Sequence, residues 1–322
     1  QRLRILIVAS LFQLQQLEQK NSPYSYRRIR KLRDKYKIHH QLRPRTENFK
    51  PRKQIAKRRQ LKITDLDIFN KCGVFEDSFD EILARIENEA NKPRTGSVFV
   101  KRTLDASVCL LLCLQILKKP VPLKVIGQEY LITKSTASRE LRFMLPIICS
   151  AVFDYIKWPM TWAINNFENG VGFIDCTGHL RNAVHPGSLD FYRGDIRDYQ
   201  ITVQTVIGLD STIWSVHFGL GHNNDMGMFY LSKMEKRLED NNMKLLADAG
   251  YSSHTLITPD PNKDRFWNHT QRYLRSKVER VIGLVKTWGI ASDTSNWSPE
   301  LHLMGLMIAY QLTAKDLKEF PI

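Results

Sequence analysis

The stretch GFIDCTG at residues 172–178 decides the fold prediction, because its apolar run ends in the charged residue Asp175. A carboxylate at the end of a buried strand is costly unless it binds a cation or accepts hydrogen bonds. The stretch LLADAGY at residues 245–251 repeats the arrangement, since a short apolar run ends in Asp248 and Gly250 turns the chain. We therefore expect two buried strands, each ending in a carboxylate with a role beyond packing.

The residues between and after these two strands show patterns of both strands and helices. Alternating apolar and polar side chains predict strands, whereas apolar residues spaced three and four apart predict helices. The expected elements are strands at residues 199–209 and 213–218 joined by a turn at 208–211, and helices at 225–238, 273–288 and 298–317. This mixture indicates an α/β domain.

Glu279, on the helix predicted at residues 273–288, adds a third carboxylate to Asp175 and Asp248. Carboxylates from two strand ends and a following helix can converge on one point, where their oxygens suit Mg²⁺ or Mn²⁺. Two such ions activate a water or a 3′-hydroxyl and stabilise the leaving oxygen of a phosphodiester. An alternative stays open at this point, because most Asp residues after strands belong to turns.

The helix that carries Glu279 also presents cations. Arg275 precedes Glu279 by four residues and Lys286 follows it by seven, so the three lie along one stripe. We expect Arg275, Arg280 and Lys286 to contact the phosphates of a nucleic acid that crosses this helix. The alternative is an exposed ion pair between Arg275 and Glu279, worth about 0.2–0.5 kcal/mol.

Residues 64–158 are predicted to form an all-helical domain. Ser78, followed three residues later by Glu81, has the pattern of a capping box at a helix start. Residues 104–117 are strongly apolar and predict a buried helix, in which two cysteines serve core packing.

One part of this region has the pattern of a helix-turn-helix. A short helix at residues 123–129 is followed by a turn, by the capping residue Thr133 and by a helix at residues 134–145. We expect Lys134 and Arg139, near the start of the second helix, to contact DNA. Two ordinary packed helices are the alternative, because Ser and Thr at a helix start are expected as caps in any case.

Positive charge is concentrated at the beginning of the chain. The 322 residues carry a net charge of +15, and residues 1–63 hold 19 Lys and Arg against 3 Asp and Glu, while the rest hold 29 against 30. Such a basic N-terminal arm is typical of proteins that bind nucleic acid, although a solvated linker or a nuclear import signal is an alternative. No apolar run reaches the roughly 18–20 residues that a membrane-spanning helix needs, so no membrane is expected as a partner.

Six short motifs in order resemble DDE-type transposases of the PIF/Harbinger superfamily, including the Harbinger transposase-derived nucleases. They are FIDCT at residues 173–177, YRG at 192–194, YQITVQ at 199–204, GLGHNND at 219–225, LLADAGY at 245–251 and RSKVERVIG at 275–283. The resemblance covers the chain from about residue 170 to its end. Cys176 stands where many relatives have Gly, a small-for-small change that leaves the acids in place.

The resemblance implies an RNase H-like catalytic core at residues 159–322, in which a mixed sheet is flanked by helices. Asp175, Asp248 and Glu279 match the catalytic triad and would hold the divalent metal cation, Mg²⁺ or Mn²⁺. Asp225 matches a recurrent acid of the family, and we interpret it as a helix cap rather than as an accessory metal ligand.

The resemblance further implies a nuclear protein that cuts DNA at transposon ends and joins it to target DNA, with the freed 3′-hydroxyl as the attacking group. A Myb/SANT-like DNA-binding partner protein and a homo-oligomer are expected on the same basis. Two other functions stay open, namely a catalytically silent DNA-binding protein derived from a transposase and a nuclease that acts on RNA.

Overall fold

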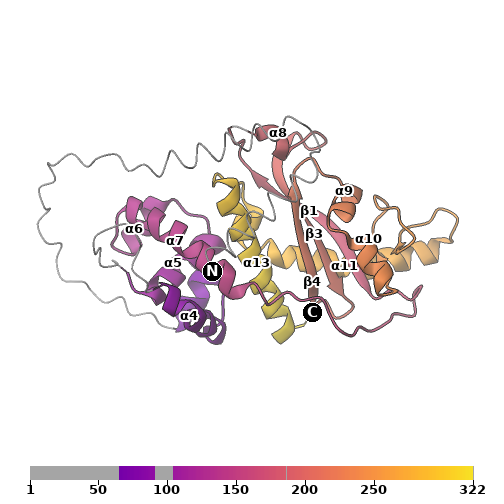
Figure 1. Cartoon of the computed structure of the whole chain (residues 1–322), viewed down its shortest axis with the longest axis horizontal. Helices are drawn as coiled ribbons and strands as arrows, with labels where there is room; N and C mark the ends of the chain where they lie inside the picture. Colours follow the sequence, from indigo (N-terminus) through magenta and orange to yellow (C-terminus); the bar gives the residue numbers. More distant parts are fainter. Residues whose placement is uncertain (1–64, 91–103, 186, 322) are drawn as a thin grey trace, which may run out of the picture. The chain divides into compact units, whose positions relative to one another are not determined.

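A computed structural model describes residues 65–90, 104–185 and 187–321, and residues Ile63–Ile322 form one compact unit (Figure 1). The predicted basic arm at residues 1–63 lies outside the described residues. The predicted division of the remainder near residue 158 stays a prediction. Within the described part of the chain, every helix is too short or too polar to cross a bilayer.

The first helices of the unit pack around one apolar helix. Their bounds are α3 (Asp65–Cys72), α4 (Glu76–Ala90), α5 (Ala106–Lys118), α6 (Leu123–Glu129) and α7 (Lys134–Val152). Most of the 13 residues of α5 are buried, Cys109 and Cys113 among them, because α3, α4 and α7 all pack against it. The prediction that these cysteines serve core packing is confirmed.

The predicted capping box at the start of α4 is wrong. The helix begins at Glu76, two residues before Ser78, and Ser78 is buried inside the first turns. Glu76 and Asp77 fill the first turn instead, where negative charge is favoured by the helix dipole.

A short helix, a tight turn and a second helix lie where the helix-turn-helix was predicted, between α6 and α7, while their role as that motif stays a prediction. The side chain of Thr133 accepts a hydrogen bond from the Thr136 N–H, and Leu131 in the turn is left-handed, with φ of 53°. The turn is tight, since a Cβ at Gly127 would lie 2.7 Å from the carbonyl oxygen of Ile132. The second helix continues past its predicted end at residue 145, because buried residues on both sides of Pro146 hold the helix together.

The α/β prediction is confirmed by a mixed sheet of six strands flanked by helices. The strands are β1 (Gly172–Arg181), β2 (Tyr192–Arg193), β3 (Asp198–Gly208), β4 (Ile213–Leu220), β5 (Leu245–Leu246) and β6 (Leu256–Ile257). Their order is β2-β3-β1-β5-β6, with β4 also paired to β3. The long strands β1, β3 and β4 are antiparallel, as the predicted hairpin between β3 and β4 requires, whereas β5 and β6 run parallel to β1.

Asp175 does not end its strand, contrary to the prediction. Strand β1 continues to Arg181, and Asp175 lies within it, opposite Thr205 of β3. The apolar run stops at Ile174, but the antiparallel ladder with β3 supplies backbone hydrogen bonds for the half-buried residues beyond it.

Helices cover both faces of the sheet. They are α8 (Ser188–Phe191), α9 (Asp225–Leu231), α10 (Met234–Asp240), α11 (Arg265–Val285), α12 (Gly289–Ser292) and α13 (Pro299–Glu319). Side chains of α9 and α10 share a core with Ile174 and Trp214 on one face, whereas α11 packs against β1 and β3 from the other (Figure 1). The single helix predicted at residues 225–238 is wrong, because Lys233 is left-handed, with φ of 55°, and separates two helices.

Two buried histidines join the sheet to the helices behind it. His179 of β1 contacts the Ala291 carbonyl at 2.7 Å and the Tyr310 hydroxyl at 3.1 Å, while His302 contacts the Ile290 carbonyl at 3.1 Å. Burial lowers the pKa of His179 to about 4 and the pKa of His302 to about 3. Both imidazoles are therefore neutral in the folded protein at neutral pH.

These histidines should make the protein less stable in weak acid. Between pH 6.5 and about 4 the unfolded chain binds protons that the folded chain excludes, so stability is lost as the pH falls through this window. We expect each histidine to cost about 1–2 kcal/mol between pH 7 and pH 5, measured by urea unfolding. His302→Gln should reduce the slope, and His254→Gln, at an exposed position, should not. An unchanged slope in His302→Gln would contradict this assignment.

Candidate functional site

Parallel pairing of β1 and β5 brings the two strand acids together. Gly172 pairs with Leu245 and Phe173 with Leu246, and three residues beyond the first pair each chain reaches an aspartate, Asp175 or Asp248. Strand β5 stops before Asp248, whereas β1 continues. The two aspartates therefore lie at corresponding positions of neighbouring parallel chains where β5 ends, and the charge of Asp248 contributes to the raised pKa of Asp175.

Asp225 joins this pair from the start of α9, and the interpretation of Asp225 as a helix cap is wrong. Asn224 is the cap, since its side chain accepts the hydrogen bond of the Gly227 N–H. A Cβ added at Gly250 would lie 3.1 Å from Oδ2 of Asp225 and 3.2 Å from Oδ1 of Asp248, so both carboxylates face the same point. The absence of a side chain at Gly250 leaves them room.

The pKa values of Asp175 and Asp225 show the effect of burial and of neighbouring carboxylates. Burial raises the pKa of Asp175 to about 6, and the charges of Asp248 and Asp225 add to the rise. Arg275 and a hydrogen bond from the Cys176 N–H lower it. Burial, followed by the charge of Asp248, also raises the pKa of Asp225. Negative charge at this point is therefore unfavourable until a cation balances it.

Arg275 links Glu279 to Asp175, because its guanidinium contacts both carboxylates. The Arg275 guanidinium places Nη2 2.8 Å from Oε1 of Glu279 and Nη1 3.4 Å from Oδ2 of Asp175. Arg275 is 18% exposed and Glu279 is 53% exposed at their side chains. The predicted ion pair between Arg275 and Glu279 thus exists, but it also includes Asp175 and is partly shielded from water.

The basic residues that were predicted to contact DNA differ in how accessible they are. Arg280 is exposed on α11, and Lys134 and Arg139 are exposed on α7. Lys286 is half-buried close to Asp175, whose charge counters the lowering of the Lys286 pKa by burial. Arg275 is engaged with the acids, so a phosphate reaches its guanidinium only in competition with them.

Sequence reasoning missed three residues beside the acids. Arg193 lies close enough to Asp225 to lower its pKa, and the thiol of Cys176 also forms a hydrogen bond with Asp225. The hydroxyl of Tyr251 donates to the Cys176 sulfur at 3.2 Å. All three belong to the conspicuous motifs YRG, FIDCT and LLADAGY, so the sequence marked them without indicating their roles.

The donor set fits a hard divalent cation. Asp175, Asp225 and Asp248 offer carboxylate oxygens, the ligands that Mg²⁺ and Mn²⁺ prefer, and positive charge would relieve their mutual repulsion. Among residues 65–90, 104–185 and 187–321, no three His, Cys, Asp or Glu side chains are already arranged as a metal site. Arg275 supplies the balancing charge in this structure.

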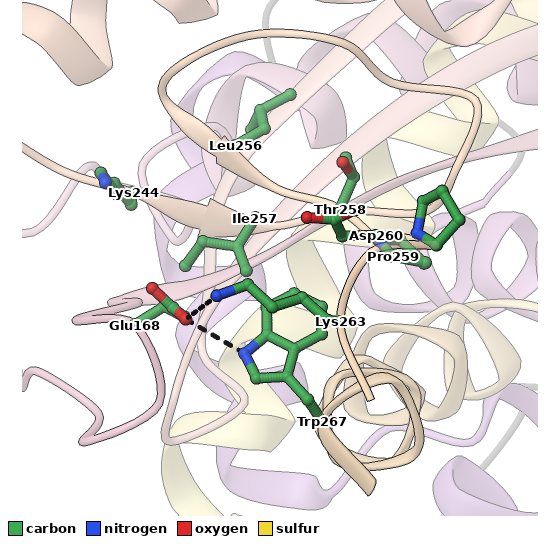
Figure 2. A pocket seen from close by; sticks show the side chains of 10 residues that line it. Glu168, Lys244, Leu256, Ile257, Thr258, Pro259, Asp260, Lys263 and Trp267 are labelled. Atoms are coloured by element: carbon green, nitrogen blue, oxygen red, sulfur yellow. Dashed lines mark hydrogen bonds and ion pairs between the residues drawn. The ribbon is translucent and has the colours of Figure 1, made fainter. Parts of the chain in front are cut away.

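A separate pocket lies away from the acids, beside β6 and the start of α11. It has a volume of about 380 Å³, and Glu168, Lys263 and Trp267 form a linked group in its wall (Figure 2). The Trp267 indole N–H donates to Glu168 at 3.0 Å, and Lys263 lies 3.9 Å from the same carboxylate oxygen. None of Asp175, Asp225, Asp248 and Glu279 lines this pocket.

Comparison with known proteins adds no family assignment. No family model matches the chain, and no curated protein matches it closely enough to count as a relative.

Replacing Arg275 should destabilise the fold, because the carboxylates around it would then repel one another. Arg275→Met removes the balancing charge, and we expect a loss of about 1–3 kcal/mol in unfolding free energy in a chelating buffer. Added Mn²⁺ should restore more stability to this variant than to the parent, as measured by urea unfolding with and without the ion. Arg272→Met is the matched control, because Arg272 is exposed on the same helix. Equal stability and equal Mn²⁺ response in parent and Arg275→Met would contradict the role of Arg275.

Proposed function

We propose that the chain is a divalent-metal-dependent nuclease of the DDE transposase type, which cleaves DNA phosphodiester bonds and transfers strands at transposon ends. The observation that carries the proposal is the meeting of Asp175 and Asp248 on neighbouring parallel strands, joined by Asp225. Metal-dependent phosphodiester chemistry needs this kind of oxygen-rich, negatively charged point.

The arrangement of the sheet supports an RNase H-like core. Three antiparallel strands, β1, β3 and β4, are followed by β5 and β6 parallel to β1, with helices on both faces. Asp175, on the central strand β1, and Asp248, just after β5, are the residues that the PIF/Harbinger resemblance matches to the first two catalytic acids. Glu279 on α11 is the third.

Acidic and basic residues would have different roles in such a site. Asp175, Asp225 and Asp248 would hold the divalent cations, and Glu279 would complete the set once Arg275 releases it. When bound, the ions would supply activation of the attacking oxygen and stabilisation of the leaving oxygen. Arg193, whose charge acts on Asp225, and Lys286, on which the charge of Asp175 acts, would then orient the scissile phosphate.

The helical region offers a surface for duplex DNA. Lys134, Ser135, Arg139 and Arg142 are exposed near the start of α7, and Ser135, Arg139 and Arg142 share one face because they are spaced by four and three residues. A second helix that presents such side chains after a tight turn suits the major groove. A nuclear location, a Myb/SANT-like partner and a homo-oligomer belong to the same proposal and rest on the resemblance alone.

A catalytically silent DNA-binding protein is the second candidate, and Arg275 favours it. Its guanidinium binds both Asp175 and Glu279, and a permanent ion pair of this kind would keep two of the acids from a metal ion. In that case the chain would bind DNA without cutting it.

Substitution of one acid separates the two candidates. In Asp248→Asn the amide keeps the size of the side chain but loses its charge, so we expect Mg²⁺- or Mn²⁺-dependent nicking of duplex DNA to fall by at least about 100-fold. Asp240→Asn, at an exposed position of α10, is the control and should cut like the parent. Gel analysis of labelled DNA and RNA duplexes measures the rates and the preferred substrate.

Two results would reject the nuclease. One is a parent protein that binds duplex DNA in Mn²⁺ without nicking it, which favours the silent protein. The other is an Asp248→Asn variant that cuts as fast as the parent while its circular dichroism is unchanged.

A further inference from the structure

Helix α11 carries a repeated pair of an arginine and an aromatic residue on its outer surface. Arg265 and Phe266 recur seven residues later as Arg272 and Tyr273. Seven residues are close to two turns of an α-helix, so the two pairs lie above one another on one face. After a further seven residues the same positions hold Glu279 and Arg280, which places Glu279 at the end of the row.

The two aromatic rings of this row are unusually open to solvent. Phe266 is 79% exposed and Tyr273 is 67% exposed. The opposite side of α11 is fixed to the sheet, since Val278 and Val281 are buried and Gln271 donates to the Ala247 and Ile257 carbonyls. The rings therefore stand on a rigid support without contributing to the core.

The arginines of the row are available for a partner as well. Arg265, Arg272 and Arg280 are exposed, and none of them forms an ion pair within the described part of the chain. Arg275, by contrast, points toward the acids. The outer face of α11 thus offers three free cations interleaved with two rings, and Glu279 is its single acid at the end next to Asp175.

Cations interleaved with exposed aromatic rings suit single-stranded nucleic acid. Arginines attract the phosphates, while the rings stack on bases, which in a duplex are hidden between their neighbours. A second copy of this chain fits less well, because the arginines of two such faces would repel one another. Charge and ring exposure together therefore favour unpaired nucleotides.

We propose that the outer face of α11, from Glu279 to Phe266, binds the unpaired end of the DNA strand that the acidic site acts on. Phe266 and Tyr273 stack on bases, and Arg265, Arg272 and Arg280 contact the phosphates between them. Glu279 lies 13 positions after Phe266, a rise of about 20 Å along the helix, which is enough for several nucleotides. The inference rests on the proposed function for the choice of DNA as the substrate.

Binding measured without divalent ions tests this surface separately from cleavage. The full chain is titrated into fluorescein-labelled single-stranded DNA and into its duplex in a chelating buffer, and anisotropy gives both affinities. The basic N-terminal residues attract both forms, so the ratio of the two affinities is the readout. Phe266→Ala combined with Tyr273→Ala should weaken single-strand binding by about tenfold or more and leave duplex binding unchanged.

Matched variants separate stacking from charge. Phe153→Ala combined with Tyr230→Ala removes two exposed rings outside α11, which are 50% and 57% exposed, and should leave both affinities unchanged. Tyr273→Phe keeps a ring and should bind like the parent. Arg272→Ala should reduce the slope of log affinity against log salt for single strands by about 0.7.

The inference is overturned if the Phe266→Ala, Tyr273→Ala variant binds single strands as tightly as the parent. It is also overturned if that variant loses only self-association in sizing experiments, which would make the face a contact between copies. A parent that never cuts DNA but shows the expected loss of single-strand binding rejects the proposed nuclease and keeps this surface. A parent that cuts DNA, together with a Phe266→Ala, Tyr273→Ala variant that binds single strands normally, keeps the proposed nuclease and rejects this surface.

Discussion

The parallel pairing of β5 with β1 is the constraint on which the candidate site depends. It sets the register in which Asp248 follows β5 at the position that corresponds to Asp175 on β1, although the pairing itself ends two residues before each acid. Gly250 then lets the chain turn without a side chain that would occupy the space between Asp248 and Asp225. A shift of one residue in this register would turn either acid to the other face of the sheet.

Arg275 offsets the repulsion among the neighbouring carboxylates in the described structure. Asp175 is largely buried next to two like charges, and unpaired it would carry a high cost of desolvation. The Arg275 guanidinium forms an ion pair with Asp175 through Nη1 and with Glu279 through Nη2. The same interaction that stabilises the fold therefore competes with any cation for the same oxygens, which ties metal binding to a movement of one side chain.

Several features of the fold could be predicted from local patterns because their causes are local. The hairpin between β3 and β4, the cap at Thr133 and the helix opened by Ser298 depend on residues close together in the chain. The end of β1 could not be predicted, since its last residues are held by a partner strand rather than by apolar character. Asp225 was misinterpreted because Asn224 and Asp225 are both good caps, and only the helix start distinguishes them.

The sequence by itself determined the α/β class, which acids are candidates for a site and the concentration of positive charge before residue 64, because these follow from residue type and from periods of two and 3.6. Only the tertiary structure decided that Arg275 lies between Asp175 and Glu279, that Asp225 joins Asp248, and that the rings of α11 face outward. These facts depend on contacts between residues up to a hundred positions apart, and no local pattern records such contacts.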